Sequence, residues 1–168
     1  YYVSSSDPAR SDSNPGTYDL PFLTIQHAAD IVKPGDTVIV KDGTYFTTTT
    51  IGIKLMSSGT VDRPITFRSE NKWGAIIDGS NYLVDGGYGI ITGDPNGVGN
   101  SYINIEDFEI RNIGQMAIYL REGSSHIEII GNYIHDIGRI CTDFSEGIVG
   151  VFSWGGTYLT IEKNKFDN

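Results

Sequence analysis

The stretch Ile103-Asn104-Ile105-Glu106-Asp107-Phe108-Glu109-Ile110 is one copy of a template that recurs further along the chain. The second copy begins with Ile127-Glu128-Ile129 and the third with Leu159-Thr160-Ile161, and each continues through a turn residue to another apolar residue. The copies start at residues 103, 127 and 159, which are 24 and 32 residues apart. This period is too long for a hairpin and too irregular for a heptad, and it is typical of stacked repeat units.

The template can be traced backwards through two earlier copies, which gives five rungs at intervals of 27, 38, 24 and 32 residues. These copies are Ile65-Thr66-Phe67 with Asn71 and Ile76, and Val38-Ile39-Val40 with Asp42 and Tyr45. Further apolar runs lie between the rungs, at 51–55, 89–92, 117–120 and 148–152. Alternating apolar residues place their side chains on one face of a strand, so each rung must stack on its neighbours to bury them. The sequence therefore predicts an all-β parallel solenoid with three short strands in each of about five rungs.

Two asparagines, Asn132 and Asn164, occupy equivalent places in the bend between two strands. Asn tolerates left-handed backbone geometry, and its amide can bond backbone groups, so stacked coils can align such residues in a ladder. Asp42 and Asn71 are the counterparts expected in the earlier rungs. We interpret all four residues as scaffold.

One segment has helical periodicity, from Thr24 to Lys33. Thr24 is the expected N-cap, Pro34-Gly35 ends the segment, and the apolar residues on one side are Ile25, Ala28, Ala29 and Val32. The first rung of a solenoid needs a cover, so we predict an N-terminal capping helix. The expected organisation is a single domain over 1–168, with a strand and the capping helix in 1–36 and rungs over 37–168 that break off inside a repeat.

Charge and hydropathy exclude some classes of partner. The chain has 12 Lys and Arg against 21 Asp and Glu, a net charge of −9, so no nucleic-acid partner is expected. It also contains no apolar run long enough to cross a membrane. An acidic polysaccharide would be repelled too, unless bound cations reverse the local charge.

Several motifs resemble the N-terminal region of secreted bacterial right-handed parallel β-helix proteins of the pectate-lyase-like superfamily. They include Pro21-Phe22-Leu23-Thr24-Ile25-Gln26, Pro34-Gly35-Asp36-Thr37-Val38, Asp42-Gly43-Thr44-Tyr45 and Ile77-Asp78-Gly79-Ser80. This superfamily includes polysaccharide lyases of family 9 and of the alginate and chondroitin lyase kinds. The resemblance implies a secreted or cell-surface location and a polysaccharide partner. Because these motifs build the cap and the early rungs, they indicate the fold more specifically than the activity.

The resemblance also implies where a sugar chain would lie. The strands expected at 51–55, 89–92, 117–120 and 148–152 would form one sheet, and its outward residues and flanking turns would bind the chain. The candidates for substrate binding are Tyr119, Trp154, Asp94 and Glu122. The candidates for catalysis, as base or substrate clamp, are Lys54, Arg121, Arg139 and His135.

The chemistry implied by the family is β-elimination at a uronate, in which a proton next to the carboxylate is removed. Calcium neutralises such a carboxylate through oxygen ligands, and the candidate ligands are Asp136, Asp143 and Glu146. Each candidate also has a structural interpretation. Asp136 is equivalent to Asn112 in the repeat and so suits a turn, His135 suits a solvent-facing position, and Arg121 could pair with a nearby glutamate.

Two functions from different classes therefore follow. The first is a carbohydrate-associated β-helix that cleaves an acidic polysaccharide as a lyase. The second is a non-catalytic extracellular β-helix that serves as a surface, adhesive or filament-forming module. Unpaired strand edges at the end of a solenoid would allow end-to-end self-association of the second kind.

Overall fold

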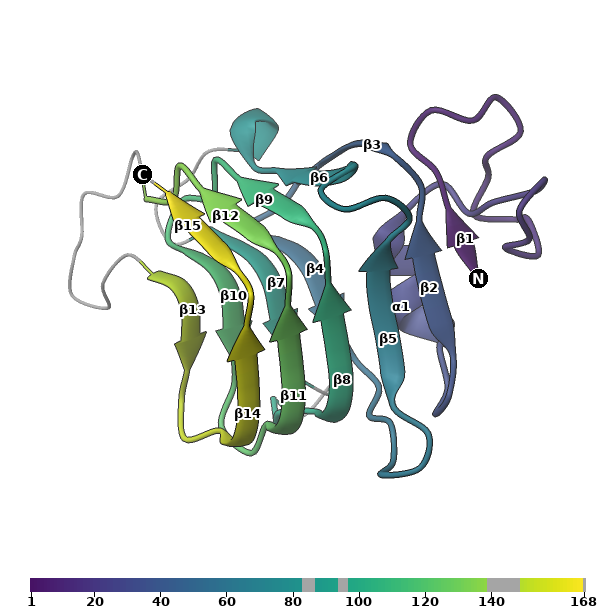
Figure 1. The fold of residues 1–168 in the computed structure, drawn as a ribbon. Helices are drawn as coiled ribbons and strands as arrows, with labels where there is room; N and C mark the ends of the chain where they lie inside the picture. Colours follow the sequence, from purple (N-terminus) through teal and green to yellow (C-terminus); the bar gives the residue numbers. More distant parts are fainter. Residues whose placement is uncertain (83–86, 94–96, 139–148, 168) are drawn as a thin grey trace.

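The computed structural model describes residues 1–82, 87–93, 97–138 and 149–167. Its strands form three parallel sheets that wind into a right-handed β-helix (Figure 1). We call the sheets A, B and C. Sheet A contains β1 (Tyr2–Val3), β2 (Thr37–Val40), β5 (Ile65–Ser69), β8 (Ser101–Glu106), β11 (Ser125–Ile130) and β14 (Thr157–Glu162).

The other two sheets complete each coil. Sheet B contains β3 (Gly43–Phe46), β6 (Ala75–Asp78), β9 (Glu109–Arg111), β12 (Tyr133–His135) and β15 (Lys165–Asp167). Sheet C contains β4 (Ile51–Leu55), β7 (Tyr88–Thr92), β10 (Met116–Leu120) and β13 (Val149–Ser153). The predicted coil of three short strands is confirmed, and sheets A and B carry it through five successive rungs.

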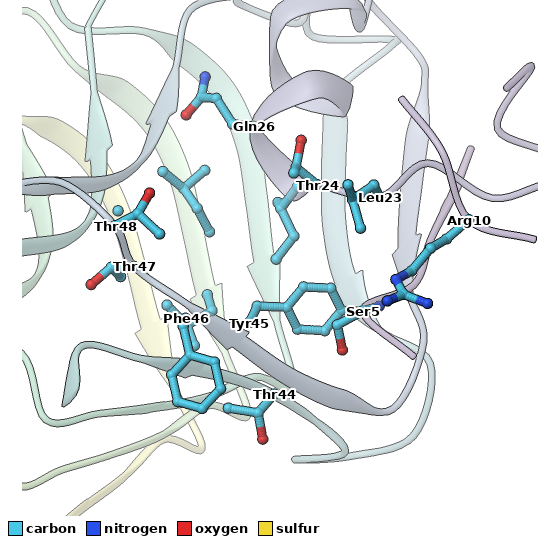
Figure 2. Close-up of a pocket in the computed structure, with 14 residues that line it drawn as sticks. Ser5, Arg10, Leu23, Thr24, Gln26, Thr44, Tyr45, Phe46, Thr47 and Thr48 are labelled. Atoms are coloured by element: carbon cyan, nitrogen blue, oxygen red, sulfur yellow. The ribbon is translucent and has the colours of Figure 1, made fainter. Parts of the chain in front are cut away.

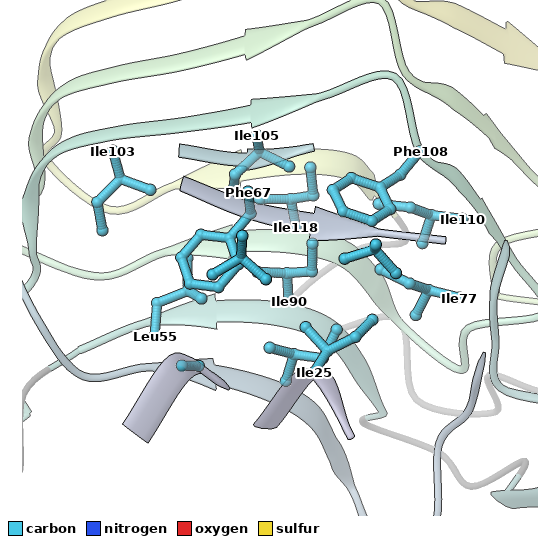
Figure 3. Packing of buried hydrophobic residues seen from close by; sticks show 14 of the residues in the cluster. Ile25, Leu55, Phe67, Ile77, Ile90, Ile103, Ile105, Phe108, Ile110 and Ile118 are labelled. Atoms are coloured by element: carbon cyan, nitrogen blue, oxygen red, sulfur yellow. The ribbon is translucent and has the colours of Figure 1, made fainter. Parts of the chain in front are cut away.

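The interior is filled by columns of aliphatic side chains, one from each coil. In sheet A, Ile65 pairs with Ile103, Ile103 with Ile127 and Ile127 with Leu159, so the repeat template becomes a stack in register. The four isoleucines at 103, 105, 127 and 129 are completely buried. Figure 3 shows how Phe67, Ile105 and Phe108 meet Ile90 and Ile118 from the opposite sheet. This burial is the main stabilising contribution of the repeat.

Two details of the predicted register are wrong in the first two coils. Val38 pairs with Phe67 and not with Ile65, so the first interval is 29 residues and not 27. In the second coil the inward residue after the turn is Ile77, which pairs with Ile110, while Ile76 is only half-buried. The cause is a longer bend: Trp73 adopts a positive φ of 63° there, and its backbone N–H bonds to the carbonyl of Asp107.

The corners of the coils repeat the same backbone conformation. Tyr102, His126 and Tyr158 begin consecutive strands of sheet A with φ of 57°, 52° and 53°. Asn112 and Asp136 end consecutive strands of sheet B, both with φ of 54°. Left-handed residues spaced as the template is spaced are what a stack of identical corners requires. The interpretation of Asp136 as a turn residue equivalent to Asn112 is confirmed.

The predicted asparagine ladder is present in the bend between sheets A and B. Asn132 is fully buried; its Nδ2 donates to the carbonyl of Ile105 at 2.9 Å, and its Oδ1 accepts from the N–H of Phe108 at 3.0 Å. Asn164 continues the ladder, because its Oδ1 accepts from the backbone N–H of Asn132 at 2.8 Å. In the first two coils, Asn71 Nδ2 bonds the carboxylate of Asp42 at 2.9 Å.

The capping helix α1 (Ile25–Ile31) covers the first coil (Figure 1). It is shorter than the predicted segment Thr24–Lys33, but Thr24 is its N-cap and accepts from the N–H of His27 at 3.1 Å. Gln26 binds both backbone groups of Lys54, at 2.7 and 3.0 Å, as a neighbouring strand would. The helix therefore satisfies part of the open edge of β4 as well as covering the core. Within the described residues, no helix is both long and apolar enough to span a membrane.

The asparagine ladder yields the first prediction. Replacing Asn132 by alanine leaves buried backbone groups of two coils without partners, so the free energy of unfolding should fall by about 2–3 kcal/mol. Urea denaturation measures this difference. Asn81→Ala, at an exposed position, is the control and should change stability by less than about 0.5 kcal/mol. Equal effects of the two substitutions would contradict the structural role of the ladder.

Candidate functional site

The outer face of sheet C carries a column of side chains contributed by all four of its strands. The register aligns Lys54 of β4, Ile91 of β7, Tyr119 of β10 and Phe152 of β13. The prediction that these segments form one sheet is therefore confirmed. Neighbouring strands lie about 4.8 Å apart, so this column runs along the axis of the helix, in the direction in which a bound linear polymer would lie.

Aromatic rings form a strip on this face. The ring centroid of Tyr119 lies 5.5 Å from that of Tyr88 and 5.5 Å from that of Phe152. The strip continues to Trp154, whose ring is 6.3 Å from that of Phe152 and which is 58% exposed. Large exposed rings on one face are an uncommon feature of a protein surface that has no binding role.

An open groove of about 340 Å³ lies beside the aromatic strip, lined by Gly97, Tyr119, Arg121, Glu122 and Trp154. Four of the eleven residues that sequence reasoning selected thus meet in one place. They come together because Tyr119 lies near the end of β10, Arg121 and Glu122 follow that strand, and Trp154 follows β13, the next strand of the sheet.

The position of Arg121 depends on its neighbours in the adjacent coil. Its backbone N–H donates to Thr92 Oγ1 at 3.0 Å, and that hydroxyl lies 2.8 Å from the hydroxyl of Ser124. A Cβ on Gly93 would lie only 2.9 Å from the Arg121 side chain, so glycine leaves room for the arginine to pass. Among the described residues, the guanidinium forms no ion pair, although Arg121 is only half-exposed. Its charge is therefore available to a carboxylate.

The remaining predicted residues lie elsewhere or outside the described part. Lys54 is on the same face but two strands from Tyr119, roughly 10 Å away along the axis, and does not line the groove. Asp94, Arg139, Asp143 and Glu146 lie outside the described residues. The roles of all these residues stay predictions.

His135 lies on a different face from the groove, on the outside of sheet B. Its Nδ1 is 2.8 Å from Asp136 Oδ2 and its Nε2 is 3.2 Å from Glu109 Oε1. A neutral imidazole has one N–H, so only the protonated ring can donate both bonds at once. The Tyr133 ring stacks on His135 with centroids 4.2 Å apart. With a side chain only 15% exposed, His135 is held in place and is not the solvent-facing residue that the sequence suggested.

Sheet B carries a connected row of charges that sequence reasoning missed. Arg111 Nε donates to Asp78 Oδ2 at 2.7 Å, and its Nη1 donates to Glu109 Oε1 at 2.8 Å. The register places Asp78, Arg111, His135 and Asp167 in one column, so acids and bases alternate along it. The 24- and 32-residue spacing of the template contained this information, since it separates Arg111 from His135 and His135 from Asp167.

Electrostatics within this row shift two pKa values. Burial by itself would raise the pKa of Asp78, but hydrogen bonds from Arg111, Ser80 and Asn112 outweigh it, and the pKa lies below its usual range. The hydrogen bond to Asp78 correspondingly raises the pKa of Arg111. Both shifts favour the charged pair, which therefore stabilises the fold at neutral pH.

The described residues do not assemble a calcium site. No three His, Cys, Asp or Glu side chains within the described ranges are placed to hold a metal ion together. Asp136 is the only described member of the predicted ligand set, and its carboxylate contacts His135. One carboxylate does not meet the requirement of Ca²⁺ for six to eight oxygen ligands.

Comparison with known proteins gives a consistent assignment of the fold. Residues 1–149 match the family described as "Pel9A-like, right handed beta helix region". The chain is 34% identical over 141 residues to the uncharacterized protein YwoF of Bacillus subtilis (strain 168), covering 81% of this chain and 28% of that protein. It is 40% identical over 78 residues to pectate lyase PEL9 of Emericella nidulans, covering 46% of this chain and 18% of the relative.

Solved structures agree on the fold alone. Pectate lyase Pel9A superposes with a TM-score of 0.73 at 22% identity, covering 98% of this chain and 38% of that one. A GH136 lacto-N-biosidase from Eubacterium ramulus has a TM-score of 0.70 at 18% identity, covering 99% and 34% of the two chains. A rhamnogalacturonan lyase has a TM-score of 0.64 at 24% identity, covering 81% and 36%. The chain thus spans well under half the length of these proteins, and the named activities differ among them.

The Asp78–Arg111 pair yields the second prediction. Because the pKa of Asp78 is lowered on folding, the pair stabilises the protein above the unfolded pKa of about 3.9, and this contribution is lost as the pH falls through the lower folded value. Asp78→Asn should lower the free energy of unfolding by about 1–3 kcal/mol at pH 7. The gap between the wild type and the variant should close in acid.

Urea unfolding at several pH values measures this gap. Asp62→Asn, at an exposed position, is the matched control and should leave both the stability and its pH dependence unchanged. A gap that persists undiminished in acid would contradict the role assigned to the Asp78 charge.

Proposed function

Because the chain belongs to the Pel9A-like right-handed β-helix family, we propose that it is an extracellular, carbohydrate-associated β-helix that acts as a polysaccharide lyase on an acidic polysaccharide. The observation that carries the proposal is the groove on sheet C. There an arginine that forms no ion pair among the described residues lies beside two aromatic residues on the face that runs along the helix axis.

Each residue of the groove suits one part of a uronate chain. The rings of Tyr119 and Trp154 offer apolar faces for the C–H faces of pyranose rings. The guanidinium of Arg121 can bind a uronate carboxylate with two parallel hydrogen bonds. Since an arginine keeps its proton, we assign Arg121 to carboxylate binding and not to proton abstraction.

The proposed reaction is a β-elimination. A base removes the proton on the carbon next to the carboxylate, a carbon–carbon double bond forms, and the bond to the leaving glycosidic oxygen breaks. The leaving oxygen takes up a proton, so no water is consumed. Neutralising the carboxylate stabilises the enolate-like intermediate, and Arg121 supplies one positive charge for this purpose. For the base and for calcium, the candidates stay Arg139, Asp143 and Glu146, which precede β13 in the sequence.

The third prediction tests the groove by binding. Arg121→Gln should weaken binding of an acidic polysaccharide such as polygalacturonate about tenfold or more, because it removes a charge-assisted contact. Trp154→Ala should weaken it roughly fivefold through loss of stacking. Affinity electrophoresis measures both effects.

Matched controls lie on the outer face of sheet A. Arg68→Gln removes an exposed arginine and Tyr158→Ala removes a ring that is 76% exposed, both away from the groove. Neither substitution should change the affinity. If they weaken binding as much as the groove variants do, the groove is not where the polysaccharide binds.

The fourth prediction tests the reaction and its cation. A lyase releases unsaturated uronides, which absorb in the ultraviolet. We expect product release from an acidic polysaccharide that stops on addition of EGTA and resumes on addition of excess Ca²⁺. Release that is insensitive to EGTA would refute the calcium proposal, while binding without any release would favour a non-catalytic carbohydrate-binding module.

A further inference from the structure

A second cavity, of about 250 Å³, lies at the N-terminal end of the β-helix between α1 and the strands β3 and β4 (Figure 2). It shares no lining residue with the groove on sheet C. Its walls come from the N-terminal segment, the start of α1 and the stretch 44–48. The cavity is therefore separate from the site of the proposed function.

The floor of this cavity is apolar. It includes Ile25, Ile53 and Ile77, which belong to the hydrophobic core of the first two coils. They are reachable because α1 has only seven residues and covers the first coil on the side of β4. A gap of this kind gives a ligand an apolar surface to cover.

One wall carries a cation whose charge is not matched by a carboxylate. Arg10 Nη1 donates to the backbone carbonyl of Asp7 at 2.8 Å, while its Nε is buried and has no hydrogen-bond partner among the described residues. The Asp7 carboxylate is engaged by Lys41 Nζ at 3.3 Å and by the N–H of Ala9 at 2.9 Å. A buried N–H without a partner is unfavourable, and an incoming anion would improve the balance of charge.

Hydroxyl groups surround the rest of the cavity. Ser5, Thr44, Thr47 and Thr48 all line it, and within the described residues no hydrogen bond is made by their side-chain oxygens. Figure 2 shows Arg10 and Ser5 together at the end of the Tyr45 ring, with Thr47 and Thr48 on the opposite side.

The Tyr45 hydroxyl, in contrast, is already used. It lies 2.8 Å from the carbonyl of Lys41, and burial raises its pKa to about 12. It therefore stays protonated and belongs to the wall of the cavity.

We propose that this cavity binds a hydroxylated carboxylate of about monosaccharide size. Arg10 binds the carboxylate, the threonine and serine hydroxyls bind the ligand hydroxyls, and the isoleucine floor covers its C–H surface. A ligand with about a dozen heavy atoms should bind with a Kd in the millimolar range. The inference does not depend on the role of the sheet C groove.

The test compares three probes on the wild-type protein by chemical-shift titration. D-glucuronate has the carboxylate and the hydroxyls, D-glucose lacks the carboxylate, and hexanoate lacks the hydroxyls. Glucuronate should bind at least about tenfold more tightly than the other two, and the largest shifts should be those of the backbone amides of residues 44–48. Equal binding of glucose, tighter binding of hexanoate, or shifts centred on Tyr119 and Trp154 would overturn the proposal.

Variants test the same assignment. Arg10→Gln should weaken glucuronate binding about tenfold, Thr44→Val several-fold, and the exposed control Arg68→Gln not at all. Thr44→Val keeps the shape of the side chain, so it decides the matter if Arg10→Gln disturbs the N-terminal segment. Unchanged affinity in Thr44→Val, or in a folded Arg10→Gln protein, would overturn the proposal.

Discussion

Each coil is hydrogen-bonded in parallel register to the coil before it and the coil after it, and this pairing sets the position of every other feature. Ile103, Ile127 and Leu159 stack because their backbones pair, and the same register brings the isoleucines at 105, 129 and 161 together. A shift by one residue would turn these columns outward and expose the core. Asn132 and Asn164 reinforce the register at the bend, where their amides tie adjacent coils together.

The register also sorts polar side chains into columns on the outside. On sheet C it yields the aromatic strip that ends beside Arg121, and on sheet B it yields the alternating row of Asp78, Arg111, His135 and Asp167. The two rows have different properties. The sheet B row is mutually paired and therefore structural in character, whereas among the described residues Arg121 has no charged partner on sheet C.

Much of this arrangement could be predicted from the sequence, because a stacked repeat converts spacing along the chain into neighbourhood in space. The columns of sheet A, the asparagine ladder, the capping helix and the meeting of Tyr119, Arg121, Glu122 and Trp154 all follow from it. The register of the first coils could not be predicted, because the bend at Trp73 changes the residue count without leaving a mark on the hydrophobic pattern. The cavity beside Arg10 was also out of reach, since it depends on how little of the first coil a short helix covers.

The central functional claim is that the outer face of sheet C binds an acidic sugar chain along the helix axis. Trp154 reports on this face directly, and Trp73 is the only other tryptophan in the sequence. In a Trp73→Phe variant, titration with an acidic oligosaccharide should therefore change the fluorescence of Trp154 in a saturable way, and Arg121→Gln in the same background should shift the midpoint to higher concentration. Saturable binding that leaves the Trp154 emission unchanged would contradict the claim.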